Sequence, residues 1–377
     1  MSLSNNASYS MRSEGAHKVS KMLITNSTLK HLDLKGNQIG GDGVAFLVNV
    51  LVNHNTSLAR LAMSDNKIRD KEGTDAIAEL LEKNSTLREL QLNSNPIEGG
   101  IIPICKGMKH NHTLHALYLN SCGLGKYTQV IGDLIGTTHS LKILHLRENY
   151  ITDAGLSDIS SGLECNSSIM QLNLEYNSFG PLGIKTLVES LKKNKTLMKI
   201  YLSENKIQDG INHISDLLKY NSTLTSINLS NPYYKQGTVP LEPLTQFLTQ
   251  LVNHKHYLTI NITGIVENPL SIKPLILNVL ENNYLIDVEH SSLGGGVSNK
   301  LLALRKRNND KLIQNWNKNF SLLKKHLKSS IFGIFLLAQK SSLSILNYDL
   351  LCYMVSWTIL YDKRNNPNQK QKFFLEI

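Results

Sequence analysis

The chain has 377 residues, of which 41% are hydrophobic and 19% are charged, and its mean hydropathy is −0.19. This composition argues against a disordered chain, and the length allows either two compact domains or one elongated array. The net charge of +10 is confined to the last fifth of the chain. Residues 1–298 carry 26 Lys or Arg and 26 Asp or Glu, whereas residues 299–377 carry 14 and 4. The body of the chain therefore lacks the charge excess expected of a nucleic-acid-binding protein.

The N-terminus and the cysteines bear on the compartment. Residues 1–18 are polar, with no apolar run behind a basic start, so we expect no cleavable secretion signal and a cytoplasmic location. The four cysteines show neither the paired spacing of a zinc site nor the density of a disulfide scaffold. We expect reduced, buried thiols, and no metal or other cofactor; the cysteines are Cys105, Cys122, Cys165 and Cys352.

The first expected element is a helix over residues 13–26, which would cap the start of an array; we assign residues 1–28 to this cap. A phrase of eleven residues follows at Leu29, with the sequence LKHLDLKGNQI, and it recurs at intervals of 27 to 29 residues. The later copies begin at Leu58, Leu87, Leu114, Leu141, Ile169, Leu197 and Leu224. A repeat of this length predicts a solenoid of stacked units.

Each phrase contains an alternating Leu-x-Leu core. This pattern predicts a short strand whose leucines face inward while the residues between them face outward. Three positions after the last leucine stands an asparagine, whose side-chain amide can satisfy backbone groups where the chain leaves the strand. These asparagines are Asn37, Asn66, Asn95, Asn149, Asn177 and Asn205, and Cys122 takes the same place in the fourth unit.

The remainder of each unit has the apolar spacing of a helix, most clearly over residues 73–84 and 155–166. We expect these helices to be closed by an asparagine in the left-handed conformation. Seven such asparagines begin Asn-x-Ser/Thr triplets, which in a secreted chain would be glycosylation acceptors. Because all seven precede a strand by the same interval, we attribute them to the repeat; they are Asn26, Asn55, Asn84, Asn111, Asn166, Asn194 and Asn221.

These phrases, asparagines and unit lengths resemble the ribonuclease-inhibitor-like class of leucine-rich repeats, in which strands and helices alternate around a horseshoe. The resemblance implies an α/β solenoid with a parallel sheet inside, helices outside, and here a small α-helical C-terminal region. It covers residues 13–230 and then weakens, since Pro232 stands where asparagine is expected. We place the array at residues 29–290, with degenerate strands around Ile260 and Val288.

The outward-facing strand residues would line the concave face, where repeat proteins usually bind. Aromatic residues and Arg anchor protein interfaces because they bury much area and still offer a polar group. Such residues gather in the fourth to seventh units, although an ordinary solvated surface could also hold a few tyrosines. The candidate binding residues are Tyr118, Ile143, His145, Arg147, Glu148, Glu175, Tyr176, Tyr201 and Glu204.

We expect no enzyme activity. No Gly-rich phosphate loop, metalloprotease motif or kinase motif set occurs, and His145 beside Glu175 has no nucleophile assigned to the same place. GTPase-activating proteins of the Ran type use this repeat class and present an Arg or neighbouring polar residues from a loop beyond the strand, where Arg69 stands here. Bacterial ubiquitin ligases with leucine-rich repeats need a catalytic Cys in a large helical domain, which the short tail around Cys352 does not provide.

Residues 299–377 form a separate region. The stretch 299–330 carries nine basic residues among apolar ones, which predicts one or two basic amphipathic helices. Two apolar runs follow, and the run at 342–361 is nearly long enough to span a bilayer. Asn347 and Asp349 in its middle favour a helix packed on its neighbours, because an intramembrane carboxylate is costly. We favour a tail that caps the array over one that contacts a membrane.

The sequence thus predicts a module that binds a protein partner of unknown identity and no nucleic acid. An array of eukaryotic type, a composition rich in Asn, Lys and Ile, and an unrelated helical tail resemble the leucine-rich-repeat effectors that intracellular bacteria inject into host cells. Such an effector would reach the host without a cleavable N-terminal signal. Two alternatives stay open: a GTPase-activating protein of the Ran type, and a cytosolic scaffold or receptor subunit with a membrane-associating tail.

Overall fold

Short strands and helices alternate along the chain in a computed structural model, which describes residues 1–4, 11–232, 238–283, 286–289, 307, 308 and 311. The strands are β1 (His31–Asp33), β2 (Arg60–Ala62), β3 (Glu89–Gln91), β4 (Ala116–Tyr118), β5 (Ile143–His145), β6 (Gln171–Asn173), β7 (Lys199–Tyr201), β8 (Ser226–Asn228), β9 (Leu258–Asn261) and β10 (Ile286–Glu289). The helices are α1 (Arg12–Thr25), α2 (Gly40–Asn53), α3 (Lys71–Lys83), α4 (Ile101–Met108), α5 (Thr128–Thr137), α6 (Asp153–Cys165), α7 (Pro181–Lys193), α8 (Ile211–Leu217), α9 (Leu241–Leu251) and α10 (Pro269–Asn282), with short 3₁₀ helices η1 (Glu98–Gly100) and η2 (Gln208–Gly210).

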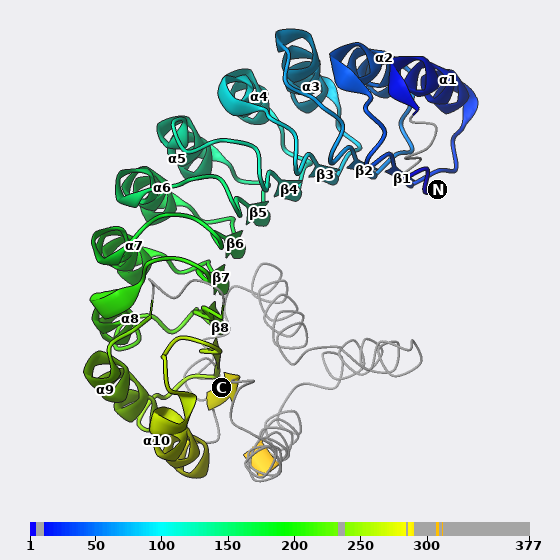
Figure 1. Ribbon diagram of the computed structural model, residues 1–377. Coiled ribbons are helices and arrows are strands. Elements are labelled where there is room, and N and C mark those ends of the chain that lie inside the picture. Colours follow the sequence, from blue (N-terminus) through cyan, green and yellow to red (C-terminus); the bar gives the residue numbers. More distant parts are fainter. Residues whose placement is uncertain (5–10, 233–237, 284–285, 290–306, 309–310, 312–377) are drawn as a thin grey trace, which may run out of the picture.

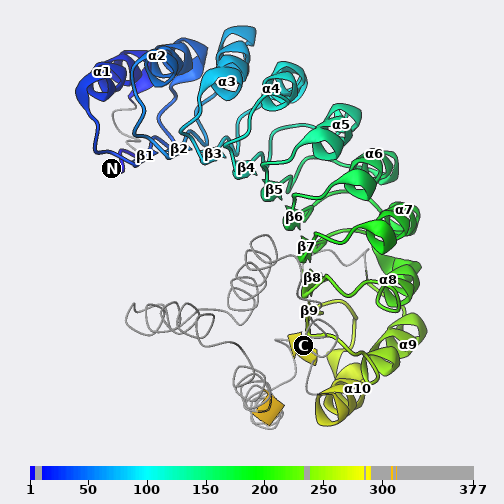
Figure 2. The same cartoon turned by 180° about the vertical axis from the view of Figure 1, so that it is seen from behind.

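The strands form one parallel sheet in sequence order, from β1 to β10. Equivalent leucines lie side by side, as Leu32, Leu61 and Leu90 do across β1, β2 and β3. Figures 1 and 2 show the sheet on the inner side of an open arc and the helices on its outer side. The predicted parallel solenoid is therefore confirmed.

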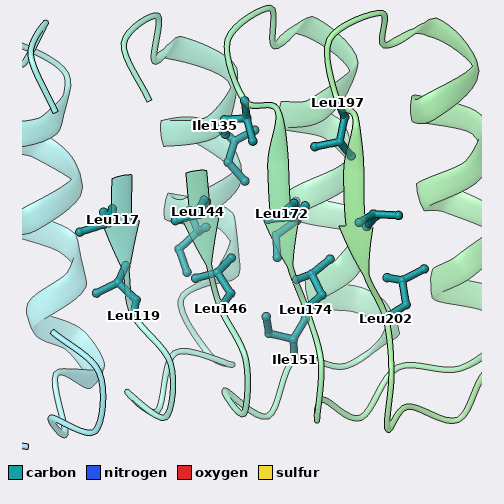
Figure 3. Packing of buried hydrophobic residues seen from close by; sticks show 14 of the residues in the cluster. Leu117, Leu119, Ile135, Leu144, Leu146, Ile151, Leu172, Leu174, Leu197 and Leu202 are labelled. Carbon is teal, nitrogen blue, oxygen red and sulfur yellow. The ribbon is translucent and has the colours of Figure 1, made fainter. Parts of the chain in front are cut away.

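The core lies between the sheet and the layer of helices. Figure 3 shows Leu117, Leu144 and Leu172 in a row across β4, β5 and β6, with Leu119 and Leu146 in the next row. All five are buried. A three-residue strand cannot bury its apolar face alone, so each unit depends on its neighbours to exclude water from these leucines.

A ladder of asparagines follows the strands, at the positions predicted from the sequence. Asn66 accepts a hydrogen bond from the Asn37 backbone N–H at 3.0 Å, and Asn95 accepts one from the Asn66 N–H at 2.9 Å. The amide nitrogen of each side chain donates to carbonyls of its own turn and the preceding unit, as Asn66 does to Leu34. Cys122 weakens this ladder, because its sulfur accepts from the Asn95 N–H less strongly than an amide oxygen would.

A second ladder of asparagines closes the helices on the opposite edge of the sheet. The Asn84 amide donates to the Leu51 carbonyl of the preceding unit at 2.7 Å, and its oxygen accepts from the backbone of Thr86 and Leu87. The expected left-handed conformation is wrong: Asn84, Asn166 and Asn194 have extended backbones, with φ of −81°, −73° and −66°. The asparagines close these helices through their side chains, so a positive φ is not required.

The second ladder accounts for the Asn-x-Ser/Thr triplets. Six of the seven triplet asparagines are buried, and the side chain of each donates to a carbonyl of the preceding unit. The six are Asn55, Asn84, Asn111, Asn166, Asn194 and Asn221. Such side chains are not available for glycosylation in the folded array.

Both ends of the array have visible contacts. At the start, the Leu3 backbone N–H donates to the carbonyl of Asp33, the last residue of β1. At the other end, Asn308 donates to the Leu280 carbonyl at 3.1 Å, as Asn283 does to Leu251. The same kind of contact thus occurs at both asparagines.

The other predictions for the tail fall on residues that the structure does not describe. They include the basic helices, the apolar runs, Asn347, Asp349 and Cys352. Within the described residues, only Arg307, Asn308 and Lys311 belong to this region. The Arg307 guanidinium donates to the Leu280 and Glu281 carbonyls at the end of α10.

The cysteines divide into two groups. Cys105 and Cys122 are buried, as predicted, and burial raises the pKa of each thiol to about 12. Cys165 is exposed, so the prediction of a buried thiol is wrong there. The reason is its place as the last residue of α6, on the solvent side of the turn that Asn166 closes.

The first ladder predicts a large effect of one buried amide. Asn149 accepts from the Cys122 and Leu124 N–H groups and donates to the Leu119 carbonyl. Asn149→Ala would leave these buried groups unpaired, at a cost of about 1–3 kcal/mol each. We expect a loss of roughly 3 kcal/mol in the free energy of unfolding, measured by urea denaturation followed by circular dichroism.

Two further variants serve as controls. Asn53→Ala removes an exposed amide of α2 and should change stability by less than about 0.5 kcal/mol. Cys122→Asn would replace a weak sulfur acceptor of the Asn95 N–H with an amide oxygen and should stabilise the array by about 1 kcal/mol. Equal urea midpoints for Asn149→Ala and Asn53→Ala would contradict the role of the ladder.

Candidate functional site

The concave face is built from the outward residues of the strands. In each three-residue strand the middle residue is buried, and the flanking residues are in most cases partly exposed. The parallel register places Tyr118 beside His145, and the next two neighbours along the same row are Asn173 and Tyr201. Ile143 lies in the adjacent row on β5 and is partly exposed. The sheet thus brings Tyr118, Ile143 and His145 together, and Asn173 separates them from Tyr201.

Tyr118 and His145 form the aromatic centre of the site. Their rings meet edge to face, with centroids 4.7 Å apart and planes at 70°. The Nε2 atom of His145 lies 3.0 Å from the side-chain amide nitrogen of Gln171 on the next strand. This geometry suits an N–H donated by Gln171 to an unprotonated His145 nitrogen. The His145 ring is therefore held between the Tyr118 ring and the Gln171 amide.

Burial alters the titration of both aromatic groups. Desolvation lowers the pKa of His145, and the carboxylate of Glu175 opposes this shift. Desolvation also raises the pKa of Tyr118, reinforced by Glu89 and opposed by Arg60. At neutral pH both side chains are uncharged, so the centre of the concave face is polar but neutral.

A second contact stands at the end of β5 and β6. The Arg147 guanidinium lies over the Tyr176 ring, 4.3 Å from its centroid, as a cation–π pair. Tyr176 is exposed and has a left-handed backbone, with φ of 52°. Glu148 is also exposed and left-handed, with φ of 57°, and accepts a hydrogen bond from Ser121. Such a conformation is strained for these residue types and persists because the first ladder holds the next residue of each turn.

Glu175 is the hub of a polar network across β6, β7 and β8. Its carboxylate accepts hydrogen bonds from Asn173 at 3.1 Å, Ser203 at 2.7 Å and Asn228 at 2.8 Å. These donors occupy Glu175, whereas Gln171 contacts His145. The two groups therefore lack the direct pairing that a catalytic base and its orienting carboxylate need.

One predicted site residue is misplaced. Glu204 is only 5% exposed, so the prediction that it stands on the binding surface is wrong. It lies in the turn after β7 with φ of 56°, and its backbone N–H donates to the Ser230 carbonyl of the next unit. The conformation of the turn thus holds Glu204 against the unit that contains Ser230.

Sequence reasoning also missed residues that shape the site. Gln171, Asn173, Ser203 and Asn228 hold His145 and Glu175, but the repeat pattern marks them only as outward-facing. Their outward positions on the strands and in the turns that follow were the available signal.

The described residues offer neither a cluster of metal ligands nor a helix able to cross a membrane. No group of three or more His, Cys, Asp or Glu side chains is arranged to hold a metal ion in the part of the chain that is described. Among the same residues, no helix combines the length and the apolar character that a bilayer crossing requires.

Comparison with known families agrees with this geometry. A family model described as "Leucine Rich repeat" matches residues 25–48, 83–102 and 138–160. Each match spans the end of one unit and the beginning of the next. The described part of the chain has the fold of a leucine-rich-repeat solenoid.

The solenoid is similar to parts of larger proteins. It is 27% identical over 212 residues to the mouse "NACHT, LRR and PYD domains-containing protein 4C", covering 55% of the chain and 22% of that protein. It is 31% identical over 212 residues to the mouse "NACHT, LRR and PYD domains-containing protein 14", covering 54% of the chain and 21% of that protein. The solenoid thus spans about a fifth of the length of these curated relatives.

A solved structure shows the same fold. The leucine-rich repeat-containing protein LegL7 from Legionella pneumophila matches with a TM-score of 0.51 and 16% identity. The match covers 81% of this chain and 97% of LegL7. At this identity the likeness supports the solenoid architecture alone.

The partly buried His145 makes stability depend on pH. Its folded-state pKa is lowered, so its contribution is fully present above the unfolded value of about 6.5 and is lost as the pH falls below it. We expect the free energy of unfolding to decrease between pH 7 and pH 5, and His145→Gln to reduce this decrease. Urea titrations at both pH values test this, with exposed His139→Gln as the matched control. An identical pH dependence in wild type and His145→Gln would refute it.

Proposed function

We propose that the solenoid is a protein-protein interaction module that binds its partner on the concave face at β4–β7. The observation that carries this proposal is the fixed cluster of Tyr118, His145, Arg147 and Tyr176, in which each side chain is packed against another. Side chains that are ordered before binding lose little conformational entropy when a partner arrives. Large, partly polar groups held in this way are typical anchors of protein interfaces.

The chemistry of this face favours a protein over other partners. Tyr118 and His145 are neutral, and Glu175 is enclosed by hydrogen-bond donors. The face therefore lacks the cluster of cations that binding of a phosphate-rich partner such as a nucleic acid requires. Partly exposed Ile143 adds an apolar contact beside the two rings. A surface of mixed aromatic and amide groups, with the Arg147 cation packed on Tyr176, fits a folded protein surface or a peptide of low charge.

We further propose that this module works as an effector that an intracellular bacterium delivers into a host cell. The composition rich in Asn, Lys and Ile and the array of eukaryotic type support this. The free thiols of Cys105 and Cys122 suit a reducing cytoplasm. A scaffold or receptor subunit is the alternative, supported by the similarity to segments of the NACHT, LRR and PYD domains-containing proteins.

Three tyrosines give the test of the concave site. With a partner recovered from host-cell lysate by the full chain, alanine at Tyr118, Tyr176 and Tyr201 should weaken binding by several kcal/mol in total. The fold should survive, because none of the three belongs to the leucine core. Calorimetry of the purified pair measures the change in affinity.

Tyr220→Ala is the matched control. Tyr220 is 62% exposed and lies beside Lys192 near the end of α8, away from the sheet. Its loss should leave the affinity unchanged. If the triple variant binds as tightly as wild type, the concave face at β4–β7 is not the site.

A GTPase activator is the second candidate, because Arg69 borders an open groove. The groove has a volume of about 800 Å³ and lies between the strand-to-helix turns of the second and third units. Lys71, Lys106 and Glu98 also line it. An exposed Arg beside a groove could approach a nucleotide bound to a partner.

The two candidates differ in a direct assay. An arginine finger accelerates GTP hydrolysis on the order of a thousandfold or more. We expect the full chain to leave the hydrolysis rates of a panel of small GTPases unchanged. Acceleration that Arg69→Ala abolishes and Lys126→Ala keeps would establish the activator instead.

A further inference from the structure

The two edges of the solenoid differ in charge. We define the helix-to-strand rim as the nine turns that lead from α1–α9 into β1–β9. We define the strand-to-helix rim as the nine turns that lead from β1–β9 to the next helix. Because every strand is parallel, all turns of one kind lie along the same edge of the sheet. The helix-to-strand rim comprises residues 26–30, 54–59, 84–88, 109–115, 138–142, 166–170, 194–198, 218–225 and 252–257.

The helix-to-strand rim carries positive charge without any negative charge. Its turns contain seven Lys or Arg and seven His, but no Asp or Glu. The strand-to-helix rim also contains seven Lys or Arg, yet it has six Asp or Glu and no His. With His counted as neutral, the two rims therefore differ by six charges, entirely because acidic residues are missing from one of them.

Most of these cations have no anionic partner within the described part of the chain. Lys219 pairs with Asp216 at 3.4 Å. The other six have no ion pair among the residues that the structure describes, and five of them are exposed while Lys142 is partly buried. They are Lys30, Arg88, Lys109, Lys142, Lys195 and Lys255.

The charges are densest where the third, fourth and fifth units meet. The His115 N–H donates to the Arg88 carbonyl, and the Lys142 N–H donates to the His115 carbonyl, both at 2.8 Å. Three basic side chains thus start from adjacent backbone positions. Burial lowers the pKa of Lys142, which is the direction expected where a cation lacks a compensating anion.

Helix ends explain only part of this pattern. A cation in the last turn of a helix is stabilised by the partial negative charge there, an effect confined to about one turn. Lys30, Arg88 and Lys142 stand five residues beyond the ends of α1, α3 and α5, immediately before the strands. The last helix carbonyls, moreover, already accept hydrogen bonds from the second asparagine ladder.

We propose that the helix-to-strand rim binds the surface of an anionic lipid bilayer. The cations follow the whole edge of the sheet instead of gathering in one pocket, and six of the seven are lysines. Lysine is a flexible point charge that responds to the average potential of a surface, whereas paired recognition of single anions favours Arg. The rim would lay one edge of the arc on the membrane and leave the concave face open to a protein.

The first seven of these turns lack the features of other polyanion sites, whereas the last two hold Tyr220 and Tyr257. Single-stranded nucleic acid is bound by aromatic platforms, and the first seven turns contain no Phe, Trp or Tyr. Their asparagines are mostly buried in the second ladder and cannot read bases. An acidic protein partner would need an exposed aromatic anchor for a stable interface, which these seven turns also lack.

The test compares two variants of the full chain with equal net charge. One replaces Arg88, Lys109 and Lys142 with Ala on the helix-to-strand rim; the other replaces Lys67, Arg69 and Lys126 with Ala on the opposite rim. Co-sedimentation uses vesicles of phosphatidylcholine with about one third phosphatidylserine, at about 0.05 M and 0.5 M salt. Vesicles of pure phosphatidylcholine measure binding that does not depend on charge.

We expect the first variant to lower the partition coefficient about a hundredfold at low salt, since each basic residue near the surface contributes about fivefold. The second variant should stay within about twofold of wild type, and high salt should release both proteins. Equal losses in the two variants, or no loss in either, would overturn the proposal and assign any binding to the basic tail or to net charge alone.

Two further measurements keep the result decisive. If the first variant melts at a lower temperature than wild type, a third replaces Lys30, Lys195 and Lys255 with Ala and should show a comparable loss of partition. Filter binding to a single-stranded RNA under the same salt conditions tests the other polyanion. Binding to RNA without binding to vesicles would refute the bilayer proposal.

Discussion

The side-chain amide of asparagine is the group on which this solenoid depends. The first ladder of asparagines follows the strands and the second closes the helices. Each amide satisfies backbone groups of its own unit and of the preceding one. Strands of three residues offer few hydrogen bonds of their own. The asparagine ladders make neighbouring units adopt the same register, which in turn aligns the leucines of the core. Loss of a single amide therefore affects two units at once.

The same register creates both surfaces to which we assign functions. It sets Tyr118 beside His145 and Arg147 over Tyr176, although the members of each pair are about one unit apart in sequence. It also sets the helix-to-strand turns in one line. Because these turns contain basic residues and no acidic ones, they form a positively charged edge. The interior is uniform while the exposed positions vary from unit to unit. Exposed residues can therefore differ between units, and bind different partners, without any change in the core residues.

The strands, their order and the inward leucines could be predicted from the sequence because they depend on periods within one unit. The contacts between units could not. The phrase around Glu175 marks it as outward-facing, but its three hydrogen-bond donors come from its own strand and the next two. The burial of Glu204 and the extended backbone of Asn84 likewise depend on the neighbouring units. A pattern within one unit predicts which side a residue faces, but the residues it contacts are set by the stacking.

Nearest-neighbour bonding also bears on how such a chain can change over time. Apart from the unit with Cys122, each unit presents the same donors and acceptors to its neighbours: the Asn37 backbone N–H donates to the Asn66 side-chain oxygen, and the Asn66 N–H donates to that of Asn95. A duplication or deletion of one whole unit, 27 to 29 residues long, would rejoin matching halves. A gain or loss of one residue inside a strand would instead break the leucine row and an asparagine ladder together. The length of the arc can therefore vary in steps of one unit. Its cross-section stays the same because the hydrogen bonds and leucine contacts between neighbouring units allow only one unit shape.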